Sequence, residues 1–125
     1  MSTQPSSKLA LVIDDDEHIR ELLQALLETA GFEVETLRDG IDAVVLKKDY
    51  RVILLDMKMP IFDAGRLTDY WKLTDPGILR RVILLSGYTR MASDRDFGTF
   101  ANIAKPFDHK VLLSTVDACL RQSES

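Results

Sequence analysis

A short apolar run, Ile53-Leu54-Leu55, leads directly into a carboxylate at Asp56. Three other runs have the same form, and each places a different polar group at its end. They are Val12-Ile13 before Asp14 and Asp15, Val82-Ile83-Leu84-Leu85 before Ser86, and Ile103-Ala104 before Lys105 and Pro106. Short apolar runs rich in β-branched residues are typical of strands buried on both faces of a parallel sheet. Ligands bind at the carboxyl ends of the strands in such a sheet, so we expect these polar groups to meet at one edge.

Strand-like and helix-like patterns alternate along the chain. The apolar runs predict strands over residues 8–13, 32–37, 51–55, 80–85 and 100–104. The second of these predicts an edge strand, because its apolar residues alternate with glutamates. The alternation indicates βαβ units, and therefore an α/β domain with one parallel sheet and helices on both faces.

The spacing of apolar residues predicts helices between the strands. Asp16 is a candidate N-cap for a helix that ends at Gly31. Further helices are expected over residues 40–48 and 63–74, whereas the composition near residues 91–97 favours only a short or irregular fourth helix. The last helix is expected to begin after Asp108 and to bury one face, made of Val111, Leu112, Val116, Cys119 and Leu120.

Length and composition indicate one globular domain. The chain has 125 residues, of which 46% are hydrophobic and 29% charged, and its formal net charge of -4 argues against direct contact with nucleic acid. A single cysteine, Cys119, excludes an internal disulfide and is expected to be buried. Residues 1–7 are polar, unlike a signal peptide, and no apolar run approaches the roughly 18 residues that cross a bilayer. We therefore expect a soluble, cytoplasmic protein without membrane contact.

Three carboxylates are expected at the ligand-binding edge: Asp14, Asp15 and Asp56. Like charges a few ångströms apart in a partly buried cleft repel one another, and a divalent cation with oxygen ligands relieves that repulsion. Mg²⁺ suits such a site, because proteins hold it with one or two carboxylates, water and phosphate oxygens. The ammonium group of Lys105 would balance the remaining negative charge. The set therefore predicts a site for Mg²⁺ and a phosphoryl group.

Asp56 is the candidate for covalent chemistry, because it stands alone at the end of the central strand. An aspartate can attack phosphorus and form an acyl phosphate. Lys105 would stabilise charge on the transferring group. The hydroxyl of Ser86 would hydrogen-bond a new phosphate oxygen and so convert a change of charge into backbone movement.

Together these motifs resemble the receiver domain of bacterial response regulators in two-component signalling, over essentially the whole chain. The resemblance rests on Val12-Ile13-Asp14-Asp15-Asp16, Leu54-Leu55-Asp56-Met57-Lys58-Met59-Pro60, Leu85-Ser86-Gly87 and Lys105-Pro106-Phe107-Asp108. It implies a flavodoxin-like, doubly wound sheet of five parallel strands in the order 2-1-3-4-5, with a cis peptide bond between Lys105 and Pro106.

The resemblance also implies roles for the site residues. Asp56 would be the phosphoacceptor, and Asp14 and Asp15 would hold Mg²⁺ together with Asp56 and the backbone carbonyl of Lys58. Ser86 would be the switch hydroxyl, and Lys105 would contact the phosphate. Such a domain assists its own phosphorylation and dephosphorylation and is not an enzyme that turns over a separate substrate.

Partners follow from the same resemblance. The phosphoryl donor would be a sensor histidine kinase or a phosphotransfer protein, the altered surface would bind a downstream protein effector, and a phosphorylation-dependent dimer stays open. The receiver domain is expected over residues 8–121, between a disordered N-terminal tail at 1–7 and a C-terminal tail at 122–125.

Two other functions are compatible with part of the pattern. A receiver-like module that binds partners without phosphorylation is suggested by the atypical segment 87–102, in which Asn102 replaces the aromatic residue usual in the family. A phosphatase of the haloacid dehalogenase type would need a second acid two residues after its nucleophile, where Lys58 stands. The complete set of three carboxylates, a hydroxyl and a lysine favours the phosphoacceptor.

Overall fold

A computed structural model describes residues 8–59, 62–87 and 97–124 of the chain. The five strands form one parallel sheet in the order β2-β1-β3-β4-β5, which confirms the flavodoxin-like arrangement and the edge position of β2. The fourth helix expected near residues 91–97 lies outside the described residues except for Phe97, which is described and is not helical. The elements are β1 (Leu9–Ile13), α1 (Glu17–Thr29), β2 (Glu33–Leu37), the 3₁₀ turn η1 (Ile41–Ala43), β3 (Val52–Asp56), α2 (Ala64–Thr74), the 3₁₀ segment η2 (Pro76–Arg81), β4 (Val82–Ser86), β5 (Ala101–Ala104) and α4 (His109–Glu124).

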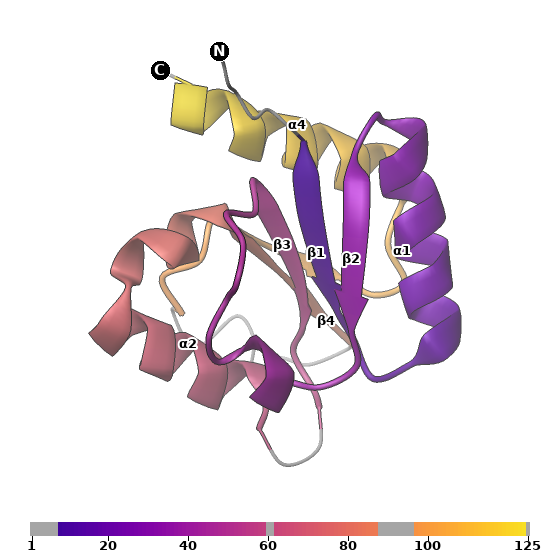
Figure 1. Ribbon diagram of the computed structural model, residues 1–125. Helices are drawn as coiled ribbons and strands as arrows, with labels where there is room; N and C mark the ends of the chain where they lie inside the picture. The colour runs from indigo at the N-terminus through magenta and orange to yellow at the C-terminus, as the bar shows by residue number, and fades with distance from the viewer. Residues whose placement is uncertain (1–7, 60–61, 88–96, 125) are drawn as a thin grey trace.

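Helices cover both faces of the sheet (Figure 1). Helices α1 and α4 pack on one face, where Val52 and Leu54 of β3 contribute to the core. Helix α2 and the two 3₁₀ segments pack on the other, where Ile53 and Leu55 contribute. All four of these side chains are at most 1% exposed, and burying an aliphatic side chain of this size contributes about 1.5–3 kcal/mol. This double burial explains why the strand reads as an uninterrupted apolar run.

The helix expected over residues 40–48 is wrong, because the chain forms only the short turn η1 there. The backbone carbonyl of Val44 accepts a hydrogen bond from the indole Nε1 of Trp71 at 3.3 Å, so this carbonyl is directed toward α2. β-Branched residues also have low helix propensity, and Val45 is 66% exposed and contributes little burial. A tertiary contact therefore replaces the local helical hydrogen bonds.

A cavity of about 270 Å³ lies beside the chain segment that follows η1. Its walls include Ile53 of β3, Trp71 of α2 and Ile78 of η2. Because Ile53 lies near the amino end of β3 and Asp56 at its carboxyl end, the cavity is separate from the acidic edge described below.

Both predicted helix caps are confirmed. Asp16 accepts hydrogen bonds from the backbone amides of His18 and Ile19, at 2.9 and 3.3 Å, and so begins α1. Asp108 accepts one from the amide of Lys110 at 2.7 Å at the start of α4. Each carboxylate satisfies amides that a helix leaves without a partner in its first turn.

The apolar face of α4 is confirmed except at one residue. Leu112, Val116, Cys119 and Leu120 are buried, but Val111 is 51% exposed, so its prediction as a core residue is wrong.

Within the described residues, no helix is long and apolar enough to cross a membrane.

Candidate functional site

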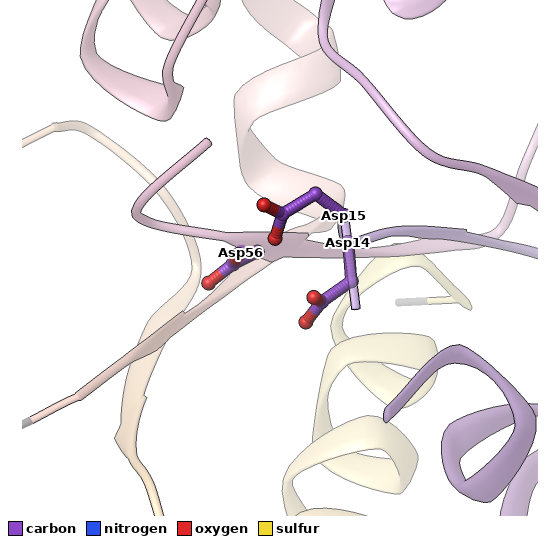
Figure 2. Close-up of side chains that lie close together, drawn as sticks. All are labelled: Asp14, Asp15 and Asp56. Carbon is purple, nitrogen blue, oxygen red and sulfur yellow. The ribbon is translucent and has the colours of Figure 1, made fainter. Parts of the chain in front are cut away.

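The register of the sheet brings the acidic residues together. Ile13 of β1 is paired with Leu55 of β3, so Asp14, which follows β1, and Asp56, the last residue of β3, lie at the same level. Asp15 follows Asp14, and one carboxylate oxygen from each of the three side chains lies within 4.8 Å of the others. Figure 2 shows the three carboxyl groups gathered around a common space. The sequence prediction that they converge is confirmed.

Lys105 closes the site from the end of β5. Its ammonium Nζ donates to Asp56 Oδ1 at 3.0 Å and to Asp14 Oδ2 at 3.2 Å. Both carboxylates are nearly inaccessible, with 1% of Asp14 and 5% of Asp56 exposed. The peptide bond between Lys105 and Pro106 is cis, as the resemblance implied. One cation therefore faces two buried anions, and the local charge stays negative.

The pKa values of Asp56 and Lys105 reflect this imbalance. Burial, together with the charge of Asp14, raises the pKa of Asp56 to about 6, although the Lys105 ammonium and the backbone amide of Lys58 act in the opposite direction. Burial alone would lower the pKa of Lys105, but its hydrogen bond and charge interaction with Asp56 and its interactions with Asp14 outweigh that effect and raise it. Asp56 therefore lacks enough positive charge around it to be fully ionised below neutral pH.

The donor set fits a hard divalent cation. Three carboxylate oxygens from Asp14, Asp15 and Asp56 converge, and no histidine or cysteine belongs to the group. Oxygen-only ligation is typical of Mg²⁺ and Ca²⁺ sites. The raised pKa of Asp56 indicates that Lys105 alone does not balance the negative charge of the site. A bound cation would supply the missing positive charge.

Ser86 and Lys58 lie beside the carboxylates on neighbouring segments. Ser86 ends β4, the strand next to β3, is 5% exposed, and its backbone carbonyl accepts a hydrogen bond from the Lys105 amide. The backbone amide of Lys58 donates to Asp56 Oδ1 at 3.4 Å, so the chain after β3 folds back toward this carboxylate. Both residues therefore lie near Asp56, as the predicted roles of the Ser86 hydroxyl and the Lys58 carbonyl require.

Sequence reasoning missed one residue at this site, Arg20. Its Nη1 donates to the backbone carbonyl of Asp14 at 2.9 Å from the first turn of α1. A cation is disfavoured at the amino end of a helix by the helix dipole. An arginine in that position, shortly after an acidic cluster, is the signal that could have identified it.

The raised pKa of Asp56 predicts how stability depends on pH in the absence of a divalent cation. The folded state holds the Asp56 proton up to about pH 6 and the unfolded state only to its ordinary value of 3.8. The stability that this group contributes is therefore present below pH 3.8 and is lost as pH rises through 6. Asparagine imitates the neutral acid, so the Asp56→Asn variant should be more stable than wild type at pH 7.5, by about 3 kcal/mol at 1.36 kcal/mol per pKa unit.

Urea unfolding in EDTA at pH 7.5 and at pH 4.0 measures this difference. The advantage of the variant should shrink toward zero at the lower pH, where wild-type Asp56 is itself protonated. An advantage of the same size at both pH values would contradict the assignment of the repulsion to Asp56.

Comparison with known proteins places this geometry in a family. Residues 10–117 match the model of the response regulator receiver domain. The chain is 33% identical over 121 residues to the transcriptional regulatory protein CpxR homolog of Haemophilus influenzae, covering 95% of this chain and 52% of that protein. It is 31% identical over 103 residues to sporulation initiation phosphotransferase F of Bacillus subtilis, covering 78% and 82% of the two chains. The chain thus spans about half the length of the first of these relatives.

A solved structure shows the same architecture. The response regulator protein TrrA of Thermotoga maritima, determined in complex with Mg²⁺-BeF, superposes with a TM-score of 0.81 at 27% identity, over 90% of this chain and 99% of that one. Sheet order, the acidic strand ends and the family match over most of the sequence agree. This chain is therefore a member of the response regulator receiver domain family.

Proposed function

We propose that Asp56 is the phosphoacceptor of this receiver domain and that its phosphorylation requires Mg²⁺. The observation that carries the proposal is the convergence of Asp14, Asp15 and Asp56 within 4.8 Å, with the Lys105 ammonium 3.0 Å from Asp56. The response regulator TrrA, which shares the fold, was determined with Mg²⁺-BeF. A site that retains all of these groups argues against a module that works without phosphorylation.

The reaction is a transfer of a phosphoryl group between two proteins. An Oδ atom of Asp56 forms the new bond to phosphorus, while the bond from phosphorus to a histidine nitrogen of the donor breaks and its electron pair stays on that nitrogen. Lys105 offers its ammonium group to the transferring oxygens, which carry most of the charge in the transition state. Asp56 attacks in its ionised form, and its raised pKa of about 6 shows that this anion is held against Asp14 with too little positive charge nearby. The approach of the negatively charged phosphoryl oxygens increases that need for positive charge.

Mg²⁺ is the proposed source of that charge. Asp14, Asp15, Asp56 and the backbone carbonyl of Lys58 are the residues that would hold it. When bound, the ion neutralises the carboxylates and the oxygens of the transferring group. The residues of the chain fix its place, since Asp14 and Asp56 are both buried and both bonded to Lys105.

We further propose that the hydroxyl of Ser86 reports phosphorylation to a protein effector. Ser86 is nearly buried beside Asp56, and its carbonyl is bonded to the backbone of Lys105, so movement of either residue would be transmitted to β5. Asn102 on β5 is exposed, and its Oδ1 accepts a hydrogen bond from the Thr99 hydroxyl at 3.4 Å, so the aromatic relay usual in the family has no counterpart at this position. The same proposal includes three further parts: a dimer that forms on phosphorylation, a receiver domain that spans residues 8–121, and a cytoplasmic location.

Incubation with acetyl phosphate tests the proposed reaction directly. The wild-type chain should gain the mass of one phosphoryl group when Mg²⁺ is present, and hydroxylamine should remove that group because it cleaves acyl phosphates. EDTA should prevent the gain. A chain that stays unmodified with Mg²⁺, or that is modified equally well in EDTA, would overturn the proposal.

A groove beside Lys105 offers a protein phosphodonor a way to Asp56. It has a volume of about 490 Å³ and lies between the start of α1 and the segment after β5. Leu22, one of its walls, is 37% exposed, and Phe107 forms part of the opposite side. Apolar side chains of this kind, next to a reactive group, are suited to contact a partner protein.

Replacing Leu22 with glutamate tests this docking surface. Transfer from a phosphorylated histidine phosphotransfer domain should slow about tenfold, the effect of losing roughly 1.4 kcal/mol of contact energy. Labelling by acetyl phosphate, which needs no protein contact, should stay the same. Leu73→Glu is the matched control, because Leu73 is 85% exposed on α2 across the sheet. Equal slowing in both variants, or slowing with acetyl phosphate, would contradict the docking role.

A further inference from the structure

Arg20 makes a contact at the metal-binding edge, although the proposed phosphoryl transfer assigns it no role. Its guanidinium donates through Nη1 to the backbone carbonyl of Asp14 at 2.9 Å, and not to a carboxylate oxygen. Asp14 is the residue after the last strand residue of β1, so its carbonyl lies beyond the paired part of the sheet. The side chain of Arg20 is half-buried, which keeps it against this backbone.

Asp14 is held at every polar group. Its amide donates to the carbonyl of Leu37 at 3.1 Å, its Oδ1 accepts from the amide of Asp16 at 2.9 Å, and its Oδ2 is bonded to Lys105. The hydrogen bond from Arg20 to its carbonyl completes the set. The position of this buried carboxylate is therefore fixed by contacts with the end of β2, the residue after β5 and the start of α1.

Asp15 differs, because its carboxylate is exposed and has no hydrogen-bond partner among the described residues. The two peptide units that flank it decide where that carboxylate lies. The unit between residues 15 and 16 is held through the Asp16 amide, and the unit between residues 14 and 15 is held through the Asp14 carbonyl. Arg20 is the side chain that holds the second of these units.

We propose that Arg20 is a positioning residue for the metal site: it fixes the peptide unit between Asp14 and Asp15, so that the exposed Asp15 carboxylate faces Asp14 and Asp56. The proposal rests on the function proposed above and assigns to α1 the task of preorganising one of the ligands. Preorganisation raises affinity because the ordering of a ligand is no longer part of the binding step. The contact also explains an arginine at the end of the helix where the dipole disfavours a cation.

The electrostatic and positional effects of Arg20 on a cation have opposite signs. The guanidinium of Arg20 near the site repels Mg²⁺, so the loss of its positive charge, taken alone, would tighten Mg²⁺ binding. Removing the hydrogen bond frees the Asp15 backbone and weakens binding. The direction of the change in affinity therefore separates the two roles.

The test is a calorimetric titration of the metal-free chain with MgCl₂, for wild type and for the variants Arg20→Met, Arg20→Lys and Arg38→Met. Arg38 is the matched control, since it is exposed just after β2 at the same sheet edge. Arg20→Met should bind Mg²⁺ about tenfold more weakly, an order of magnitude typical of residues that support metal ligands. Arg20→Lys, which keeps a donor and the charge, should recover part of the loss, and Arg38→Met should bind as tightly as wild type or slightly more tightly.

A second readout follows the peptide unit itself, without metal. The ¹⁵N order parameter of the Asp15 amide should be close to the rigid value of about 0.85 in wild type and should fall toward about 0.6 in Arg20→Met, while Asp56 and its strand stay rigid. If Arg20→Met does not fold, Arg20→Lys gives the same comparison with a smaller change. Unchanged or tighter Mg²⁺ binding in Arg20→Met, or an unchanged order parameter, would overturn the positioning role and leave the proposed function intact. Failure of the wild type to bind Mg²⁺ would overturn both.

Discussion

Asp56→Asn is expected to remove phosphorylation entirely while leaving a folded and more stable protein. The amide oxygen of asparagine is a far weaker nucleophile than a carboxylate, and no other carboxylate occupies the same place at the end of β3. The mass gained from acetyl phosphate and Mg²⁺ should fall from one phosphoryl group per chain to none. Intact-mass spectrometry measures this, and Asp42→Asn, at an exposed residue of η1, is the control that should behave as wild type.

The combination of lost chemistry and gained stability identifies Asp56 more sharply than the loss alone. A residue that mattered only for folding would lose both properties together. Asp14 is the residue to examine if label persists, because its carboxylate is buried and is bonded to the same ammonium group. Full labelling of the Asp56→Asn variant would exclude Asp56 as the phosphoacceptor.

Lys105→Met is expected to cause the largest loss of stability among these variants. The variant leaves Asp14 and Asp56 buried without the cation that bonds both of them, at 3.2 and 3.0 Å. Breaking a buried ion pair on one side costs about 3–5 kcal/mol, and the partial exposure of the Lys105 side chain reduces this to about 2–3 kcal/mol. Urea unfolding in EDTA at pH 8 measures the loss, since proton uptake by Asp56 gives little relief at that pH.

Added Mg²⁺ should restore much of the stability lost in Lys105→Met, because it brings positive charge to the same carboxylates and binds the folded state. Phosphoryl transfer should remain slow, since the cation that faces the transferring group is still missing. Lys47→Met, at an exposed lysine outside the site, is the control and should change stability by less than about 0.5 kcal/mol. Destabilisation that Mg²⁺ does not reduce would show that Lys105 acts through packing of its stem and not through its charge.

Much of the site could be predicted from the sequence because a parallel sheet makes strand ends meet. Asp14, Asp56 and Lys105 are far apart along the chain, with 91 and 49 residues separating the lysine from the two carboxylates. Each nonetheless ends a recognisable apolar run, so the residue types at the common edge follow from reading the runs alone. The caps at Asp16 and Asp108 were equally predictable, since a cap depends on neighbours within three residues.

The errors fall where a distant contact outweighs a local preference. The helix over residues 40–48 was predicted from spacing, but Trp71 on α2 binds the carbonyl of Val44 and the chain forms only a short turn. Val111 has helical spacing with the buried residues of α4, but the face that α4 presents to the sheet does not extend to it. In both cases periodicity describes the element and not the neighbour against which it packs.

The sequence by itself determined the strand runs, the helix caps and the identity of the groups at the sheet edge, because these depend on residue type and on short spacings. Only the tertiary structure decided three further properties: the hydrogen bond of Arg20 to the Asp14 carbonyl, the short 3₁₀ turn in place of an α-helix between β2 and β3, and the pKa of Asp56 of about 6. The physical reason is that burial, charge repulsion and a hydrogen bond to a backbone carbonyl depend on distances in space. Those distances are set when β1, β3, β5 and α1 pack together, and no pattern along the chain encodes them directly.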